Sequence, residues 1–264
     1  MDQNGIALIG FGAIGRTLAE LVAAEPGLRL AGVMVRERAI PEARALLPAG
    51  VPVVGDLDAL LATRPGIVVE CAGQEALLTH AEGVLAAGVP LMVISTGALA
   101  TPGLLERLTA RGSAPLIVPA GAIAGLDGLG ALKQAGLHAV TYTSTKPPLA
   151  WRGTPAERIL DLETLRERTV FFEGNARDAA LSYPKNANLA ATVALAGLGF
   201  ERTRVRLVAD PAAVGNVGEI QAMSEIGTLS VTMAGRASAN PKTSASVAYS
   251  LLHAIRSRGA RLVI

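Results

Sequence analysis

Three glycines near the start of the chain have the spacing of a dinucleotide-binding turn. Gly10, Gly12 and Gly15 follow the apolar run 6–9 and precede the helix-like stretch 16–24. In this order the first glycine permits a tight turn, the second lets the backbone approach a pyrophosphate, and the third lets helix and strand pack closely. The pyrophosphate then lies on the unpaired N–H groups of the helix N-terminus. We expect the whole turn to contact the cofactor: Gly10, Phe11, Gly12, Ala13, Ile14 and Gly15.

The end of the second expected strand bears on which dinucleotide binds. An acidic residue there usually bonds the ribose 2′-hydroxyl of NAD. Here the strand 28–35 runs into Arg36, Glu37 and Arg38, and no acid occupies the strand end itself. Arg36 and Arg38 suit the 2′-phosphate of NADP and stacking on adenine, whereas Glu37 leaves NAD open. The expected cofactor is therefore NADP or NAD.

Small residues follow two further expected strands, where open α/β sheets bind their ligands. Cys71, Ala72 and Gly73 end one strand and the segment 95–98 ends another, so the nicotinamide half of the cofactor can pass close to the backbone. Tight strand-to-helix turns need the same residue types, which leaves both interpretations open. Cys71 itself is expected to be a small buried apolar residue, because no histidine is near it in the sequence to support a thiolate.

Polar residues in the second half are the candidates for substrate contacts. Ser144, Thr145 and Lys146 follow an expected strand, and the segment 183–188 opens an apolar helix. A third segment, 240–244, opens the last helix, where helix capping accounts for its asparagine and proline. Capping does not account for paired amides on an apolar helix. Together the three segments predict an anionic substrate, with these contacts: Ser144, Thr145, Lys146, Lys185 and Asn186.

Composition excludes several classes of protein. The 264 residues carry a formal net charge of +2, and half of them are apolar. Neither a basic patch for nucleic acid nor an apolar tract of about 18 residues for a membrane is present. The single cysteine excludes a disulfide framework and a multi-cysteine zinc site. His80, His138 and His253 are too scattered for a metal site, so we expect no metal, no nucleic acid and no membrane partner, and a soluble cytoplasmic protein without a signal peptide.

The elements that must position these residues fall into two kinds. The first half alternates apolar strands with helical patterns, which predicts a parallel, Rossmann-type sheet. After about residue 120 the pattern changes to a smaller α+β domain, with expected helices at 173–181 and 186–198, antiparallel strands, and a final helix that packs back on the first domain. The predicted fold class is thus α/β. The predicted division is 1–120 for the dinucleotide-binding domain, 121–239 for the substrate and dimerisation domain, and 240–264 for the returning helix.

At this point the chain resembles the L-aspartate dehydrogenase family. The resemblance implies oxidation of L-aspartate with NAD or NADP, through iminoaspartate, to oxaloacetate and ammonia. It also implies a homodimer, a link to pyridine nucleotide biosynthesis, and cofactor contacts at Ala122 and Asn188. The matching segments occur in family order over nearly the whole chain: 10–15, 70–73, 95–98, 119–122, 125–128, 144–148, 183–192, 204–211 and 240–244.

One departure from the family bears on catalysis. The family has a catalytic histidine in a segment of the form Asn-x-His-Glu-Ile, and here Gly218 stands in its place within 216–220. A positioned imidazole supplies about 10²- to 10⁴-fold in proton transfer, so its loss predicts weakened turnover. The glycine is also expected to open space for a bulkier substrate. Lys146 and Lys185 are then candidates for either the substrate carboxylate contact or a substitute proton carrier.

Two further functions stay open at this level. The same residues suit an imine reductase or reductive aminase, because reduction of a preformed imine needs no activated water. A non-catalytic dinucleotide-binding sensor or scaffold is the alternative from another class, which the glycine at 218 favours and the lysine and asparagine segments oppose.

Overall fold

The computed structural model describes residues 2–110, 112–184, 186–235 and 244–262. It divides into two compact units. The first comprises Met1–Ser95, Gly103–Pro119 and Ala248–Ile264, and the second comprises Thr96–Pro102 and Ala120–Val247. The second unit includes residues 96–102, which follow a strand of the first, and it extends to Val247, within the range predicted for the returning helix.

The first unit contains a six-stranded parallel sheet with the order β3-β2-β1-β4-β5-β6. Its central strands are apolar on both faces, as strands covered by helices must be, and Ile6, Leu8, Ile67 and Val69 are fully buried. The predicted Rossmann-type fold is confirmed. The strands are β1 (Asp2–Ile9), β2 (Arg29–Met34), β3 (Val53–Val54), β4 (Pro65–Glu70), β5 (Leu91–Val93) and β6 (Leu116–Ile117).

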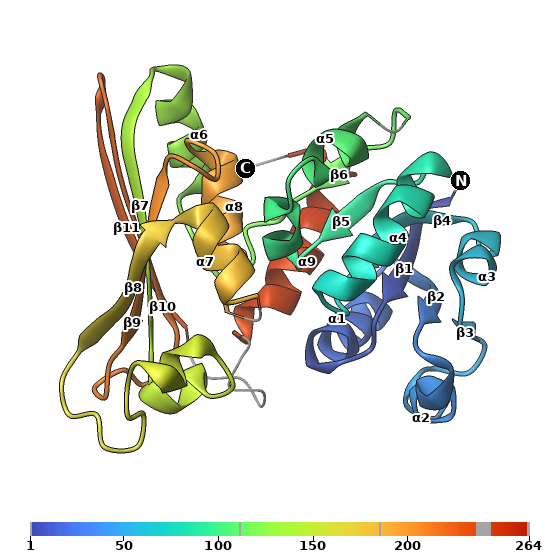
Figure 1. Ribbon diagram of the computed structural model, residues 1–264. Helices are drawn as coiled ribbons and strands as arrows, with labels where there is room; N and C mark the ends of the chain where they lie inside the picture. The colour runs from blue at the N-terminus through green and yellow to red at the C-terminus, as the bar shows by residue number, and fades with distance from the viewer. Residues whose placement is uncertain (1, 111, 185, 236–243, 263–264) are drawn as a thin grey trace. The chain divides into compact units, whose positions relative to one another are not determined.

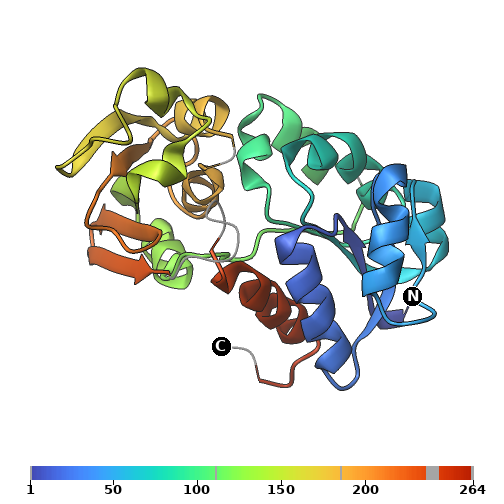
Figure 2. The ribbon, with the colours of Figure 1, turned by 90° about the horizontal axis from the view of Figure 1, so that it is seen from below.

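Helices connect these strands and pack on the sheet. The helix after the glycine turn, α1, lies beside the C-terminal helix α9 (Figures 1 and 2), so the chain end returns to this unit as predicted. Ala248, Leu251 and Ile255 form the buried face of α9. The helices are α1 (Ala13–Ala24), η1 (Glu37–Ala39), α2 (Ile40–Leu46), α3 (Leu57–Ala62), α4 (Gln74–Ala86), α5 (Leu104–Thr109) and α9 (Ser246–Ser257).

The second unit contains a five-stranded mixed sheet with the order β11-β10-β7-β9-β8. The helices α7 and α8 lie against one face of this sheet (Figure 1). The strands are β7 (Leu137–Lys146), β8 (Thr169–Asn175), β9 (Thr203–Ala209), β10 (Val217–Ser224) and β11 (Gly227–Ala234). The helices are η2 (Thr96–Ala100), α6 (Leu126–Gln134), η3 (Pro148–Trp151), η4 (Pro155–Arg158), α7 (Ala176–Ser182) and α8 (Asn188–Ala196).

Three predictions about the second unit are wrong in detail. The stretch 173–181 is not one helix: it begins in β8, and α7 starts only after Asn175, whose side chain accepts a hydrogen bond from the Asp178 N–H at 2.8 Å as an N-cap. β9 is antiparallel to β8 but parallel to β7. The helical segment between β8 and β9 returns the chain to the end of the sheet at which β8 finishes, so β9 runs in the opposite direction to β8. Lys146 belongs to β7 itself and not to a loop after it.

Two kinds of feature are absent from the described residues: a membrane-spanning helix and a cluster of metal-ligating side chains. None of the helices there is long and apolar enough to cross a membrane. No group of His, Cys, Asp and Glu side chains in the same residues is arranged to hold a metal ion.

Candidate active site

The glycine turn of the first unit has the geometry that its spacing predicts. Gly10 has φ +100°, and a Cβ on it would lie 2.6 Å from the Cα of Ala72, so only glycine fits. A Cβ on Gly15 would lie 2.5 Å from the Gly10 carbonyl oxygen, which is the close helix–strand packing expected there. Gly12, the N-cap of α1, has nothing within 4 Å of its Cβ position. The turn therefore leaves open the space over the helix N-terminus that a pyrophosphate requires.

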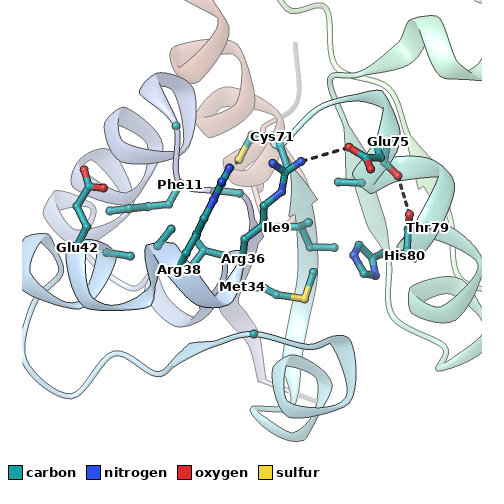
Figure 3. Close-up of a pocket in the computed structure, with 18 of the residues that line it drawn as sticks. Ile9, Phe11, Met34, Arg36, Arg38, Glu42, Cys71, Glu75, Thr79 and His80 are labelled. Carbon is teal, nitrogen blue, oxygen red and sulfur yellow. Dashed lines mark hydrogen bonds and ion pairs between the residues drawn. The ribbon is translucent and has the colours of Figure 1, made fainter.

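A cavity of about 500 Å³ adjoins this turn, a size typical of small-molecule sites. Its wall combines the ends of β1, β2 and β4, with Arg36 and Arg38 lying next to each other at one side (Figure 3). Of the predicted cofactor contacts after β4, Cys71 and Ala72 line the cavity and Gly73 does not. Cys71 is half-buried, its thiol lies 3.5 Å from the Gly10 carbonyl oxygen, and burial raises the pKa of this thiol, which opposes a thiolate role.

The carboxylate of Glu70 holds two strand-end loops of the first unit together. Its Oε1 accepts hydrogen bonds from the backbone N–H groups of Ala72 and Gly73 at 2.8 and 2.7 Å and from the Ser95 hydroxyl at 3.0 Å. Its Oε2 accepts from the Ser95 N–H at 3.1 Å. Burial raises the pKa of Glu70, and these donors oppose the rise. The cavity wall at Ala72 thus depends on a buried acid that the sequence patterns did not single out.

Replacing Glu70 with Gln is expected to lower the melting temperature by about 3–10 °C, because the new amide N–H group faces the Ser95 N–H and leaves it unsatisfied. The other three hydrogen bonds survive on the remaining oxygen. Thermal unfolding followed by circular dichroism measures the change. Ser95→Ala is the matched control, because it removes the hydroxyl donor without placing two N–H groups against each other, and it should shift the transition less. An equal or larger shift in this control would contradict the role given to Glu70.

In the second unit, a buried lysine and a buried amide form a small polar group. Lys146 on β7 is 5% exposed and Asn186 is 8% exposed. The Lys146 Nζ donates to the Asn186 Oδ1 at 2.9 Å and lies 5.0 Å from the centroid of the Trp151 ring. Among the described residues, the Asn186 Nδ2 has no hydrogen-bond partner. Since a buried donor without a partner is costly, the arrangement is suited to an acceptor that the chain does not supply.

The charge of Lys146 supports the same conclusion. Burial lowers the pKa of Lys146 to about 8. In the described part of the chain it forms no ion pair, and its cation faces only the amide oxygen and the indole ring. A carboxylate bound here would pair with the ammonium group and complete the hydrogen bonding of Asn186. The chemistry of this lysine and asparagine therefore suits one carboxylate.

Gly218 lies on the same face of the sheet as Lys146. It pairs with Ser144 across β10 and β7, and Lys146 is two residues further along β7, so position 218 is a diagonal neighbour of the lysine. The expected open space is not there. A Cβ on Gly218 would lie 2.8 Å from the Ile123 Cδ1 and 3.4 Å from the Tyr142 hydroxyl, because these side chains fill the volume. Burial raises the pKa of Tyr142, so its hydroxyl keeps its proton at neutral pH.

The remaining predicted site residues are only partly brought together. Thr145 is buried but alternates to the opposite face of β7 from Lys146. The Asn188 Oδ1 accepts from the Gly97 N–H at 3.0 Å, and its carbonyl oxygen accepts from the Thr96 hydroxyl at 2.6 Å, so Asn188 positions η2. Ala122 lies in the half-buried segment between β6 and α6. Lys185 and residues 240–243 lie outside the described residues.

The histidines have no catalytic arrangement. His80 lines the cavity of the first unit, where partial burial lowers its pKa, so it is neutral at physiological pH. His138 and His253 are exposed on β7 and α9. Sequence reasoning missed Trp151 and Tyr142, the two largest fully buried side chains, which form the walls around Lys146 and Gly218. The only available signal was that Trp151 is the single tryptophan and follows two prolines.

A nucleotide turn on a parallel sheet, combined with a separate α+β unit that has a buried cationic site, defines the class of NAD(P)-dependent dehydrogenases. Residues 10–114 match the family model described as the NAD-binding domain of homoserine dehydrogenase. Residues 127–258 match the model described as the C-terminal domain of aspartate dehydrogenase.

Relatives cover the whole length of the chain. It is 47% identical to an L-aspartate dehydrogenase of Cupriavidus taiwanensis over 96% of this chain and 97% of that one. It is 45% identical to an L-aspartate dehydrogenase of Pseudomonas aeruginosa over 95% and 96%. The crystal structure of aspartate dehydrogenase from Thermotoga maritima matches with a TM-score of 0.74 at 28% identity, over 98% of each chain. The chain belongs to the L-aspartate dehydrogenase family and is an NAD(P)-dependent amino-acid dehydrogenase, as the sequence motifs predict.

Proposed function

We propose that the enzyme oxidises L-aspartate with NAD or NADP to iminoaspartate, and that water then converts the imine to oxaloacetate and ammonia. The observation that carries the proposal is the buried pair of Lys146 and Asn186, a cation and an unsatisfied amide donor suited to one substrate carboxylate. A dicarboxylic amino acid uses such a site, whereas a neutral imine leaves it empty. The relatives' names give the same substrate.

The chain's residues divide the work as follows. The glycine turn would hold the cofactor pyrophosphate, and the cofactor would supply the acceptor for the hydride from the substrate Cα. Lys146 and Asn186 fix one carboxylate, which restricts how the substrate lies and so lowers the entropic part of the barrier. Trp151 and the covering side chains keep water from Lys146, which strengthens its attraction for an anion.

Proton transfer is the weak part of this site. The substrate ammonium must lose a proton before or during oxidation, and a water must be activated to hydrolyse the imine. Position 218 supplies no side chain for either task, and the neighbouring Tyr142 cannot act as the base because burial raises its pKa and keeps its hydroxyl protonated. We therefore expect slow turnover in deamination and relatively better reduction of oxaloacetate in the presence of ammonia, where the imine forms in solution.

A substrate panel tests the proposal. We expect NAD(P)H formation with L-aspartate, at a kcat/KM at least about 10-fold higher than with L-alanine, because a buried charge pair contributes more than about 1.4 kcal/mol. L-asparagine and the α-amide of aspartate then identify the carboxylate that binds at Lys146. Equal rates with L-alanine would contradict the carboxylate site, and faster reduction of cyclic imines than of oxaloacetate with ammonia would favour an imine reductase.

The proposal also includes a homodimer working in the cytoplasm, with iminoaspartate available to pyridine nucleotide biosynthesis. It is supported by the family resemblance and by the outer face of the second sheet, where β7 and β11 carry short hydroxyl side chains such as Thr141, Thr143, Ser230 and Thr232. Light scattering after size-exclusion chromatography measures the mass. A monomer at micromolar concentration would contradict this part of the proposal.

A further inference from the structure

A cluster of aromatic side chains in the second unit lies beside Lys146. Trp151 contacts Phe171 and Tyr183 edge-on, with ring centroids 4.8 and 6.4 Å apart, and Phe172 contacts Tyr183 in the same way at 5.4 Å. Trp151 is fully buried, and it is the single tryptophan of the chain. A chemical change confined to tryptophan therefore alters this cluster alone.

The position of the indole ring is fixed independently of the lysine. The Trp151 Nε1 donates to the carbonyl oxygen of Val208 on β9 at 3.0 Å. Pro147 and Pro148 restrict the backbone where β7 passes into η3, so the turn that carries the ring is stiff. Because this hydrogen bond, the aromatic contacts and the proline turn all hold the indole, the ring defines where the cation of Lys146 lies.

The face of this ring carries the ammonium group of Lys146. The Lys146 Nζ lies 5.0 Å from the centroid of the Trp151 ring, within the range of a cation–π contact, and donates to the Asn186 Oδ1 at 2.9 Å. The backbone N–H of Asn186 donates in turn to the carbonyl oxygen of Tyr183 at 2.9 Å. Since Tyr183 also packs against Trp151, the aromatic cluster sets the positions of both donors, the lysine and the asparagine.

The ring distinguishes the two protonation states of the lysine. Only the ammonium form is attracted by the negative face of the π system, and this attraction is strongest where water is excluded. A buried lysine without such a partner tends to lose its proton. We infer that Trp151 is a positioning residue for the substrate carboxylate, because its ring face keeps Lys146 protonated and aimed at the site that the lysine shares with Asn186. The inference rests on the proposed function in that a carboxylate binds at Lys146.

The elements around Lys146 carry other titratable or charged groups. Tyr142 lies on the same face of β7 and Tyr183 lies against Trp151, and burial raises the pKa of both hydroxyls. The N–H of Asp210, which follows β9, donates to the Lys146 carbonyl oxygen at 2.9 Å, and the Asp210 carboxylate lies 3.9 Å from the Arg168 Nε. A variant without the lysine therefore has to show which group titrates beside the ring.

Fluorinated tryptophan tests the inference with almost no change in the shape of the ring. Fluorine atoms withdraw electron density from the ring face and so weaken its attraction for a cation, whereas the indole N–H becomes a stronger donor and keeps its bond to Val208. Because the chain has one tryptophan, incorporation throughout the protein changes Trp151 alone.

Binding of succinate, a dicarboxylate without an amine, is measured by calorimetry on the intact enzyme with saturating cofactor. We expect tetrafluorinated Trp151 to leave the Kd within about twofold at about pH 6.5, where the lysine stays protonated and contacts the ring with or without succinate. At about pH 9 the Kd should rise about 3- to 30-fold, because a larger share of the lysine is neutral. Monofluorinated enzyme should lie between. In Lys146→Met, fluorination should change the Kd less than about twofold.

The monofluorinated protein also gives a readout that needs no ligand. Its single fluorine resonance should move as Lys146 loses its proton, with a midpoint at about pH 8, and this titration should be absent in Lys146→Met. A resonance that does not titrate, or that titrates equally in Lys146→Met, would overturn the inference. So would a succinate Kd that fluorination leaves unchanged at about pH 9. Failure of the unlabelled enzyme to bind succinate at any pH would instead refute the carboxylate site of the proposed function, and the fluorine titration would still decide whether the ring holds the lysine.

Discussion

Replacing Lys146 with Met will lower kcat/KM for L-aspartate by about 100-fold or more and leave the Kd of the cofactor within about twofold. Methionine keeps the length of the side chain and removes its charge. Because Lys146 is buried and forms no ion pair within the described residues, its loss does not strand a partner carboxylate in the protein. Removing a buried charge favours the folded state and leaving the Asn186 Oδ1 without its donor opposes it, so the stability should stay close to that of the wild type, which separates a binding defect from unfolding.

Steady-state kinetics and cofactor titration measure this effect. Lys133→Met is the matched control, since Lys133 is exposed on α6 and should leave kcat/KM unchanged. Asn186→Ala removes the second donor and should cost less than the lysine, because the ammonium group remains. A Lys146→Met enzyme with wild-type kcat/KM would remove the carboxylate site from the mechanism.

Introducing a histidine at position 218 is expected to raise kcat by about 10²- to 10⁴-fold, provided that room is made for it. The Cβ of the new residue would meet the Ile123 Cδ1 at 2.8 Å, so the single variant Gly218→His is strained. Combining it with Ile123→Val removes this terminal methyl group. The imidazole would then lie opposite Ser144 and diagonal to Lys146, whose positive charge keeps it neutral and able to accept a proton.

The four proteins of this cycle separate the explanations. Ile123→Val alone should resemble the wild type, Gly218→His alone should gain less than the double variant, and the double variant should show a kcat that rises with pH through the range in which imidazole titrates, near pH 6.5. If the double variant folds, binds the cofactor and turns over no faster than the wild type, the missing imidazole does not limit the reaction.

The first unit could be predicted from sequence because its signals are local. The glycine turn follows a continuous apolar strand, and Gly10 and Gly15 adopt the close contacts that their spacing implies. Arg36 and Arg38 could be placed at the end of a strand for the same reason. What the local pattern could not give was the direction of Glu37, since a short helical turn after β2 decides which of three neighbouring side chains enter the cavity.

The site of the second unit was harder to predict, because it depends on residues that lie far apart in the sequence. Ser144 and Lys146 were recognised as unusual polar residues, but only strand pairing puts them on the same face as Gly218 and sends Thr145 to the other. The contact of Lys146 with Asn186 spans 40 residues, and no local pattern encodes it. The volume left by a glycine is likewise set by distant residues, here Ile123 and Tyr142, so the expectation of open space at 218 was wrong.

If protonated Lys146 holds a substrate carboxylate, as we propose, the binding of succinate must depend on pH through this lysine. Succinate has two carboxylates and no amine, so above about pH 7 only the protein titrates. Burial lowers the pKa of Lys146 to about 8, so the side chain is protonated well below that pH and loses its charge as the pH rises above it. Burial raises the pKa of Tyr183, which packs against Trp151 beside the lysine, so this hydroxyl loses its proton only at a higher pH than a free tyrosine does.

The measurement is calorimetry with saturating cofactor between about pH 7 and about pH 10. The Kd of succinate should be constant at the lower end, rise up to about tenfold per pH unit above about pH 8, and be weak and independent of pH in Lys146→Met. A wild-type Kd that stays flat or falls as the lysine loses its proton would contradict the carboxylate site and assign Lys146 the role of a neutral proton acceptor instead.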